Sequence, residues 1–363
     1  MKVETKKRIL LITPTLECGG AERFVSMFCD HIDTNIFSVC LVVVNNTRPF
    51  YNISNPAIEI IDLEKKRVLF SLQGIKTVVK KFKPDIIFST ANHLNVYLGI
   101  FRNSFDKNIK FIARESSIVS INSQRTSMPR LYNRLLKKYY KRFDHIICQS
   151  RYMQEDLCRN YQIPANKTSV IHNAVSVETQ ASPVITANDA GKLYKLITVG
   201  RLSEEKGIER LIHTVGLLSI PFQYFIIGDG DKKNDLKSLI NELRLQDKVF
   251  LLGEKTDPFK GLEDADLFLM GSYYEGFPNV LAEAGTMGIP VIAFRAPGGI
   301  GEIIEDGKNG LLVEDNDILG YASAINRGIS ANFNRQQIIE VSKERFSVTT
   351  MIAKLEKLLM QLL

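Results

Sequence analysis

Short apolar segments rich in Ile and Val recur along this chain, and most are followed by residues with the periodicity of an amphipathic helix. A short continuous apolar run is typical of a strand buried on both faces, as in a parallel sheet. Such runs occupy 8–13, 38–44, 58–63, 85–90, 110–116, 145–150 and 168–173 in the first half, and 195–200, 223–230, 248–253, 266–272, 290–294 and 310–314 in the second. Strands that alternate with helices in this way predict an α/β protein with two Rossmann-like, doubly wound parallel sheets.

Two domains are expected, because a single core usually stops growing near roughly 250–300 residues and this chain has 363, of which 45% are hydrophobic. Residues 176–192 are rich in Ser, Thr, Ala, Asn and Asp and lack a clear period, which predicts a linker. We therefore predict domains over 1–175 and 193–345, followed by a final helix over 346–363 that crosses back to the N-terminal domain. Since ligands of doubly wound sheets bind beyond the carboxyl ends of the strands, the two domains are expected to face one another across a cleft.

The formal charge of +7 and the isoelectric point near 9.0 favour anionic partners. Such partners include nucleic acids, phosphorylated metabolites and acidic membrane surfaces. The five cysteines form no CxxC pair, and the start MKVETKKRILLIT lacks the long apolar core of a signal peptide. No apolar run approaches the roughly 20 residues that span a bilayer. We expect a cytoplasmic protein that contacts a membrane only peripherally.

Two segments have the composition of phosphate-binding sites. Gly19 and Gly20 stand between the first strand and a helix, where backbone amides approach an anion closely and the helix N-terminus favours negative charge. Arg201 directly follows a strand, and Lys206 stands five positions later. Two fixed cations at this edge of a sheet suit a diphosphate. The alternatives are a tight turn at the glycines and solvated charge at the cations.

The segment YYEGFPNVLAE (273–283) places two carboxylates eight positions apart. Pro278 and Asn279 suit the start of a helix, so Glu275 is expected in the preceding loop and Glu283 about one turn inside the helix. A carboxylate repels a diphosphate but accepts hydrogen bonds from the vicinal hydroxyls of a ribose or hexose. An acid and base pair for glycoside hydrolysis is the weaker alternative, because nothing in the local sequence raises the pKa of either acid.

Together these motifs resemble those of the family 4 retaining glycosyltransferases of GT-B fold. EGFPNVLAE resembles that family's E-x7-E signature, Arg201 and Lys206 its R-x4-K donor diphosphate pair, and CGGAER its N-terminal glycine loop. The similarity extends over essentially the whole chain and is stronger over 196–314 than in the first half. It implies an acceptor-side domain at the N-terminus and a nucleotide-sugar-binding domain at the C-terminus.

The resemblance also implies a role for each motif residue. Glu283 would bind the nucleotide ribose and Glu275 the donor sugar, while Arg201 and Lys206 would neutralise the leaving diphosphate. The donor would be a nucleotide-diphosphate sugar, a UDP-sugar, that supplies a hexose or N-acetylhexosamine. The other residues assigned to the donor are Gly19, Gly20, Gly228, Asp229, Lys255, Gly276, Phe277, Pro278, Asn279 and Val280.

This chain departs from the family where a histidine usually follows an N-terminal strand near the sugar, because it reads ARESS at 113–117. Some bacterial surface-polysaccharide transferases carry a similar acidic variant. Glu115 is therefore a catalytic candidate that would orient the acceptor or stabilise the reacting sugar. Arg114 and His93 are further acceptor-side candidates, and a hydrogen-bonded packing role is the alternative for His93.

The family mechanism implies retention of configuration at the transferred sugar. The acceptor hydroxyl approaches on the face that the nucleotide leaves, and a diphosphate oxygen takes its proton. Catalysis then requires positioning and stabilisation of separating charge rather than a strong protein base. The resemblance implies no metal or other cofactor. Asp264 and Asp266 form a DxD sequence, but they open an apolar strand, so we expect no metal site there.

Residues 128–143 predict a basic amphipathic helix on the acceptor side. Leu131, Leu135, Tyr139 and Phe143 recur at helical spacing beside Leu136 and Tyr140, and cations occupy much of the rest. Such a helix binds an anionic membrane surface or packs on its own sheet with a solvated basic face. The implied acceptor is an undecaprenyl-diphosphate-linked saccharide in O-antigen, capsule or related glycan synthesis, at the inner face of the cytoplasmic membrane. No nucleic acid partner is expected, because no aromatic RNA-reading motif accompanies the scattered cations.

Three other functions use a related architecture. A non-hydrolysing nucleotide-sugar epimerase would use the donor without an acceptor. A non-catalytic module would bind the nucleotide sugar without turnover, and Arg201, Lys206 and Glu275 argue against it. An NAD-dependent dehydrogenase is disfavoured, because GDGDKK has the first two glycines of GxGxxG but Lys233 at the position of the third.

Overall fold

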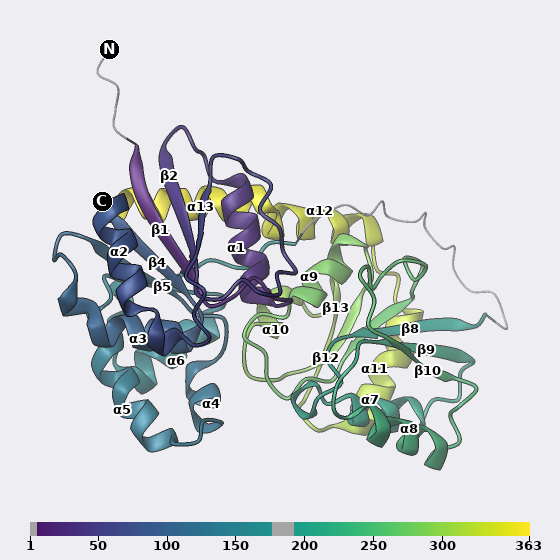
Figure 1. Ribbon diagram of the computed structural model, residues 1–363. Helices are drawn as coiled ribbons and strands as arrows, with labels where there is room; N and C mark the ends of the chain where they lie inside the picture. The colour runs from purple at the N-terminus through teal and green to yellow at the C-terminus, as the bar shows by residue number, and fades with distance from the viewer. Residues whose placement is uncertain (1–5, 176–191) are drawn as a thin grey trace. The chain divides into compact units, whose positions relative to one another are not determined.

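The structure, a computed structural model, describes residues 6–175 and 192–363 and divides the chain into two compact units (Figure 1). The first unit comprises Met1–Ala174 with Val348–Leu363, and the second comprises Val175–Ser347. Of the predicted linker 176–192, all but Lys192 lies outside the described residues. Each unit is built on one parallel sheet, which confirms the predicted α/β class with two Rossmann-like domains.

The described part of the first unit holds a sheet of seven parallel strands in the order β3-β2-β1-β4-β5-β6-β7. These strands are β1 (Lys7–Thr13), β2 (Phe37–Val43), β3 (Glu59–Asp62), β4 (Ile86–Thr90), β5 (Lys110–Arg114), β6 (His145–Cys148) and β7 (Thr168–Val170). Consecutive residues of β1, from Ile9 to Ile12, have no exposed surface. Burial on both faces of the sheet explains why its inner strands are continuous apolar runs.

The helices of the first unit cover both faces of its sheet. They are α1 (Gly20–His31), α2 (Leu72–Phe82), α3 (Asn92–Phe101), α4 (Val119–Gln124), α5 (Pro129–Tyr139), α6 (Arg151–Tyr161) and α13 (Val348–Leu362), with short 3-10 helices η1 (Val68–Phe70), η2 (Arg102–Ser104), η3 (Tyr140–Arg142) and η4 (Ala165–Lys167). The chain moves one way from β1 to β2 and the other way from β4 to β5. Right-handed crossovers therefore place α1 and α3 on opposite faces.

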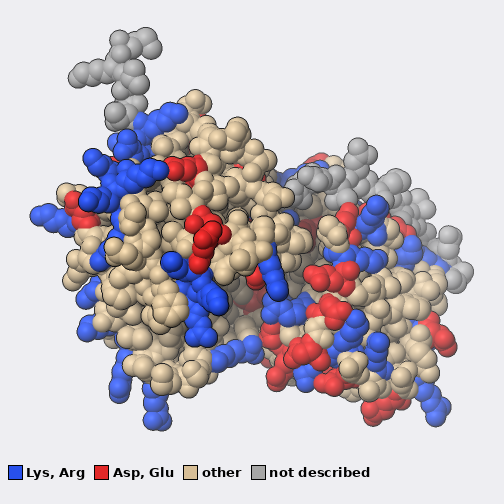
Figure 2. Space-filling model, viewed as in Figure 1, with Lys and Arg blue, Asp and Glu red and all other residues tan. Residues whose placement is uncertain are grey.

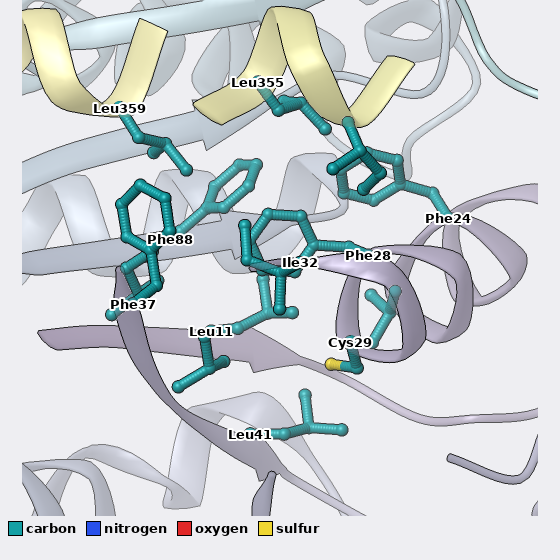
Figure 3. Close-up of a cluster of buried hydrophobic side chains, with 14 of the residues drawn as sticks. Leu11, Phe24, Phe28, Cys29, Ile32, Phe37, Leu41, Phe88, Leu355 and Leu359 are labelled. Atoms are coloured by element: carbon teal, nitrogen blue, oxygen red, sulfur yellow. The ribbon is translucent and has the colours of Figure 1, made fainter. Parts of the chain in front are cut away.

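The C-terminal helix α13 belongs to the core of the first unit, although it follows the second unit in sequence. It packs on α1. Leu355 and Leu359 have no exposed surface and point toward a cluster that includes Phe24, Phe28 and Phe88 (Figure 3). The three rings pack on one another with centroids 5.7 to 6.1 Å apart. The last helix thus packs beside α1 over the buried side chains of the sheet.

The second unit has a sheet of six parallel strands within its described residues, in the order β10-β9-β8-β11-β12-β13. These strands are β8 (Tyr194–Val199), β9 (Phe222–Ile227), β10 (Val249–Gly253), β11 (Leu267–Met270), β12 (Val291–Phe294) and β13 (Gly310–Val313). Its helices are η5 (Glu204–Lys206), α7 (Ile208–Val215), α8 (Lys233–Glu242), α9 (Asn279–Thr286), α10 (Ile300–Ile303), α11 (Ile318–Ser330) and α12 (Arg335–Phe346). The strand order reverses between β8 and β11, which defines the switch point where doubly wound sheets bind ligands.

The basic segment 128–143 forms α5 and then the 3-10 turn η3 rather than one continuous helix. Its buried stripe also differs from the prediction, because Leu136 and Tyr140 are buried while Leu131 is 47% exposed. Phe143 of the predicted stripe is buried as well. The hydroxyls of Tyr132 and Tyr140 both have hydrogen-bond partners inside the unit, which favours burial of the side of the helix that carries them. In the part of the chain that the structure covers, every helix is too short or too polar to cross a bilayer.

Candidate active site

The candidate site of the second unit lies at the carboxyl ends of β8 and β11, the switch point of its sheet. Arg201 and Lys206 follow β8, and Glu275 and Glu283 follow β11, so two neighbouring strands carry the four charged residues. A cavity of about 10 Å³, lined in part by Gly200, Lys206 and Ser272, opens at this edge. The topology therefore brings two separate sequence motifs to one side of one sheet.

Lys206 and Glu275 are in direct contact at this edge. The Lys206 Nζ atom lies 2.6 Å from Glu275 Oε1, and the Ser272 hydroxyl donates to the same oxygen at 2.7 Å. Glu275 is only 9% exposed. Among the described residues, none donates to Glu275 Oε2. A carboxylate held rigidly through one oxygen keeps the other available for a ligand hydroxyl, while the lysine beside it suits an anionic ligand group.

The loop that carries Glu275 is held against the loop after β8 by close backbone contact. Gly207 has a left-handed φ of 54°, and a Cβ on it would lie 2.1 Å from the Gly271 carbonyl oxygen. A Cβ on Gly271 would lie 2.3 Å from the Gly207 oxygen. The Tyr273 amide also donates to the Glu205 carbonyl at 2.9 Å. Only glycine fits at both positions, so these two residues set the separation of Lys206 from Glu275.

Arg210, on α7, also binds the loop that carries Glu275, and this role was not predicted from the sequence. It is 4% exposed. Its Nε donates to the Gly271 carbonyl at 2.6 Å, one terminal nitrogen donates to the Ser272 carbonyl at 2.7 Å, and the other to Asp315 at 2.7 Å. The guanidinium also lies 4.1 Å from the ring centre of Tyr273. Within α7 Arg210 follows another charged residue, Glu209, so the local sequence carries no signal for this role.

A second glycine loop holds the backbone of Glu275 from the side of β12. The Glu275 amide donates to the Pro297 carbonyl at 2.9 Å, and the Gly299 amide donates to the Glu275 carbonyl at 3.3 Å. Gly298 has a φ of 119°, and a Cβ there would lie 1.5 Å from the Glu275 oxygen. The catalytic candidate is therefore fixed by backbone contacts on two sides.

The other two charged candidates are placed differently. The Arg201 side chain is 74% exposed, and its NH1 lies 4.0 Å from Glu205 Oε1. Glu283 is half-buried inside α9, about one turn from its start. Pro278 occupies the N-cap of α9 and Asn279 is its first residue, so Asn279 does not take the capping position proposed from its residue type.

The remaining donor-site candidates of this unit lie in the loops after β9, β10 and β11. A Cβ on Gly228 would lie 1.9 Å from the Gly200 oxygen, so this loop touches the one that begins with Arg201. Asp229 pairs with Lys233 at 2.6 Å, and this cation lowers the pKa of the Asp229 carboxyl. Lys255 is exposed just after β10. The segment between Glu275 and α9 supplies Gly276, the buried Phe277, and Val280 in the first turn of the helix.

In the first unit, Glu115 lies in a closed polar network rather than at a surface. It has no exposed surface. Its oxygens accept hydrogen bonds from Asn95 at 2.6 Å, from Asn92 at 3.2 Å and from the Tyr140 hydroxyl. Burial raises the pKa of Glu115, and these donors and Arg114 oppose the rise. The network ties α5 to α3 and to the end of β5, so contact between Glu115 and an acceptor would require it to open.

Arg114 and the glycine loop lie near one another in the same unit. Arg114 is 1% exposed, its guanidinium lies 3.8 Å from the ring centre of Phe24 on α1, and it contacts Asn173. Burial lowers the pKa of Arg114, which Glu115 partly offsets. Gly19 is the N-cap of α1 and Gly20 its first residue. His93 is exposed in the first turn of α3, after β4.

The two carboxylates of the DxD sequence, Asp264 and Asp266, both pair with lysines. Asp266 accepts from Lys192 at 2.6 Å and from the Lys195 amide at 2.8 Å, and Asp264 pairs with the Lys195 side chain at 2.5 Å. Both precede β11, at the edge of the sheet opposite the candidate site. Carboxylates neutralised in this way do not fit a divalent metal.

Sequence comparison identifies the family of both halves. Residues 18–179 match the family model described as Glycosyltransferase Family 4, and residues 186–345 match that described as Glycosyl transferases group 1. One similar relative is the N-acetylgalactosamine-N,N'-diacetylbacillosaminyl-diphospho-undecaprenol 4-alpha-N-acetylgalactosaminyltransferase of Campylobacter jejuni. It is 28% identical over 314 residues, which cover 84% of this chain and 85% of the relative.

Solved structures show the same fold. The apo lipopolysaccharide outer core galactosyltransferase WaaB superposes with a TM-score of 0.80 at 20% identity, over 98% of this chain and 100% of that one. Anabaena Alr3699/HepE in complex with UDP-glucose superposes with a TM-score of 0.76 at 20% identity, over 98% and 99% of the two chains. With both halves matched by glycosyltransferase models and the fold shared along almost the whole length, this chain belongs to the family 4 glycosyltransferases of GT-B fold.

Proposed function

We propose that this glycosyltransferase transfers a hexose or N-acetylhexosamine from a UDP-sugar, with retention of configuration, to an undecaprenyl-diphosphate-linked saccharide in bacterial surface-polysaccharide synthesis. The observation that carries the proposal lies at the β8–β11 switch point, where Lys206 and Ser272 both bind Glu275 Oε1. It places a cation for a diphosphate beside a carboxylate for sugar hydroxyls. The complex of HepE with UDP-glucose supports the choice of donor.

The chemistry assigned to these residues is the stabilisation of charge as the sugar separates from the diphosphate. Lys206 and the more exposed Arg201 bind the leaving diphosphate, whose negative charge grows as the bond breaks. Glu275 orients the sugar through its hydroxyls. The acceptor hydroxyl attacks on the face that the diphosphate leaves, and its proton passes to a diphosphate oxygen. The bond from the anomeric carbon to the diphosphate breaks as the new glycosidic bond forms.

We propose that no metal ion takes part. Arg201 and Lys206 supply the positive charge that binds the diphosphate. The DxD carboxylates are neutralised by Lys192 and Lys195. Transfer should therefore proceed at an unchanged rate after dialysis against EDTA. A loss of activity that Mg²⁺ or Mn²⁺ restores would contradict this part of the proposal.

The acceptor assignment rests on the charge of the first unit and on the relatives. This unit contains 29 Lys and Arg and 15 Asp and Glu, a net charge of +14, whereas the second unit contains 18 and 25, a net charge of −7. Lys and Arg side chains are prominent over the first unit in Figure 2. The excess positive charge thus lies in the unit without the Lys206–Glu275 pair, which favours a second anionic partner besides the donor. The Campylobacter relative is named for a diphospho-undecaprenol substrate.

One set of assays on the purified protein tests the proposal. UDP-, GDP- and ADP-sugars are screened by thermal shift, since a ligand that binds the folded state raises its melting temperature. The stabilising donor is then incubated with a lipid-linked saccharide, and NMR determines the anomeric configuration of the product. We expect stabilisation by a UDP-sugar and a retained anomer. An inverted product would refute retention, conversion of the donor without acceptor would indicate an epimerase, and binding without turnover would indicate a non-catalytic module.

A further inference from the structure

We propose that residues 65–70 and the first turn of α5 form one docking surface for an anionic lipid bilayer, with Leu69 and Phe70 entering the headgroup region. The inference rests on the proposed function, because a lipid-linked acceptor requires the enzyme to work at a membrane. It adds a second segment to the basic helix and names the bilayer as the partner of both.

The segment 65–70 combines cations with exposed apolar side chains. Lys65, Lys66 and Arg67 are exposed. They directly precede η1, where Leu69 is 66% exposed and Phe70 is 61% exposed. A single exposed apolar residue is normal on a protein surface, but two consecutive large ones next to three cations have the composition of a membrane-binding segment.

This segment is held in place by hydrogen bonds. The Tyr97 hydroxyl of α3 donates to the Leu69 carbonyl at 2.8 Å. The Ser71 hydroxyl and amide both donate to the Val68 carbonyl, at 2.6 and 3.0 Å. Leu69 and Phe70 are therefore presented to solvent by an ordered turn, so their exposure does not reflect a loosely attached loop.

The first turn of α5 presents a similar combination on the same face of the sheet. Met128 is 61% exposed and Leu131 47% exposed, and the nearby Arg130 and Arg134 are exposed. Both η1 and α5 pack on α3, which covers one face of the sheet. The two segments therefore flank α3 on one side of the unit.

The charge of this surface selects a bilayer over a second copy of the chain. Cations bind lipid phosphates while neighbouring apolar side chains enter the interface, so anionic lipid satisfies both features at once. In a symmetric dimer the same surface meets itself, and Lys65, Lys66 and Arg67 would oppose their own copies. The net charge of +14 on this unit adds to that repulsion.

The test is co-sedimentation of the full chain with phosphatidylcholine vesicles that contain or lack phosphatidylglycerol. We expect binding to the anionic vesicles only. Leu69→Ala with Phe70→Ala should weaken it by about tenfold, and Lys65→Gln, Lys66→Gln and Arg67→Gln by about fivefold per cation. Matched controls are Leu319→Ala, an exposed leucine of the second unit, and Lys354→Gln with Lys357→Gln on α13. These controls should bind like the wild type.

The outcomes separate this inference from the proposed function. Wild-type binding to anionic vesicles that neither variant weakens, equal binding to neutral vesicles, or no binding at all would overturn the docking surface. A wild-type dimer in sedimentation equilibrium that dissociates when Leu69 and Phe70 are substituted would also overturn the docking surface. Transfer to a water-soluble saccharide acceptor should stay at the wild-type rate in every docking variant. If the wild type binds vesicles but transfers no sugar, the proposed function fails and the docking surface stands.

Discussion

At the scale of single residues, the candidate site centres on one carboxylate oxygen of Glu275. Glu275 Oε1 receives both the ammonium of Lys206 and the hydroxyl of Ser272. Hydrogen bonds to a charged group are stronger than those between neutral groups. The orientation of Glu275 toward a donor sugar therefore depends on a serine that no motif identified, although it stands only three positions before the glutamate.

Ser272→Ala is expected to reduce transfer without unfolding the protein. Loss of one hydrogen bond to a carboxylate costs about 1.5–3 kcal/mol, so kcat should fall by roughly 10- to 100-fold if the bond is needed in the transition state. Steady-state kinetics with the stabilising UDP-sugar measures this. Ser330→Ala, at an exposed hydroxyl of α11, serves as the control. Wild-type kcat in Ser272→Ala would show that Lys206 alone orients Glu275.

Glu115 should make stability depend on pH. Its pKa is raised above the ordinary value of 4.5, so the folded state retains the proton over a range where the unfolded state has lost it. The stability contributed by this residue is complete below pH 4.5 and decreases as the pH rises through the raised value. Glu115→Gln removes the titration. Relative to this variant, the wild-type free energy of unfolding should fall as the pH increases from 4.5, as measured by urea denaturation. Parallel pH profiles would contradict the assignment.

At the scale of elements, the site consists of the loops after β8, β11 and β12, which contact one another at the carboxyl edge of the second unit's sheet. The thirteen predicted strands all occur, because buried parallel strands are continuous apolar runs that local sequence reveals. The pairing of Lys206 with Glu275 follows from the order of strands and motifs. The role of Arg210 and the buried network of Glu115 could not be predicted, since their partners lie on other elements and leave no periodic signal. The same is true of the choice of which side of α5 is buried.

Arg210 is expected to position the Glu275 loop rather than contact the donor. Arg210→Lys keeps the charge but cannot donate to Gly271, Ser272 and Asp315 together. We expect kcat to fall at least about tenfold, with a smaller change in the donor KM. The control is Arg335→Lys, because that arginine also donates to a backbone carbonyl but at Ala265, before β11. If both variants lose activity only in proportion to lost stability, Arg210 has no positioning role.

At the scale of the whole molecule, the candidate active site and the excess positive charge lie in different units. The second unit holds the Lys206–Glu275 pair, and the first carries the positive charge. The helix α13 belongs to the first unit, so the core of this unit needs a segment that follows the second unit in sequence. Its stability therefore depends on residues beyond the second unit.

Leu355→Ala should destabilise the first unit. Removal of a fully buried leucine from a core costs about 2–5 kcal/mol, and Leu355 has no exposed surface. Thermal unfolding followed by calorimetry should show an earlier transition, while the UDP-sugar still stabilises the second unit. Met360→Ala changes an exposed residue of the same helix and is the control. An unchanged profile in Leu355→Ala would mean that α13 contributes little to this core.

Lys206 and Glu275 of the second unit are the residues that we propose to act in sugar transfer from the nucleotide-diphosphate sugar. The most direct measurement compares the rate of sugar transfer by the wild type, Lys206→Ala and Glu275→Ala at saturating UDP-sugar, with melting temperatures recorded for each. We predict that both substitutions reduce the rate by about 100-fold or more and leave the protein folded. Turnover at the wild-type rate in both folded variants would contradict this role for Lys206 and Glu275.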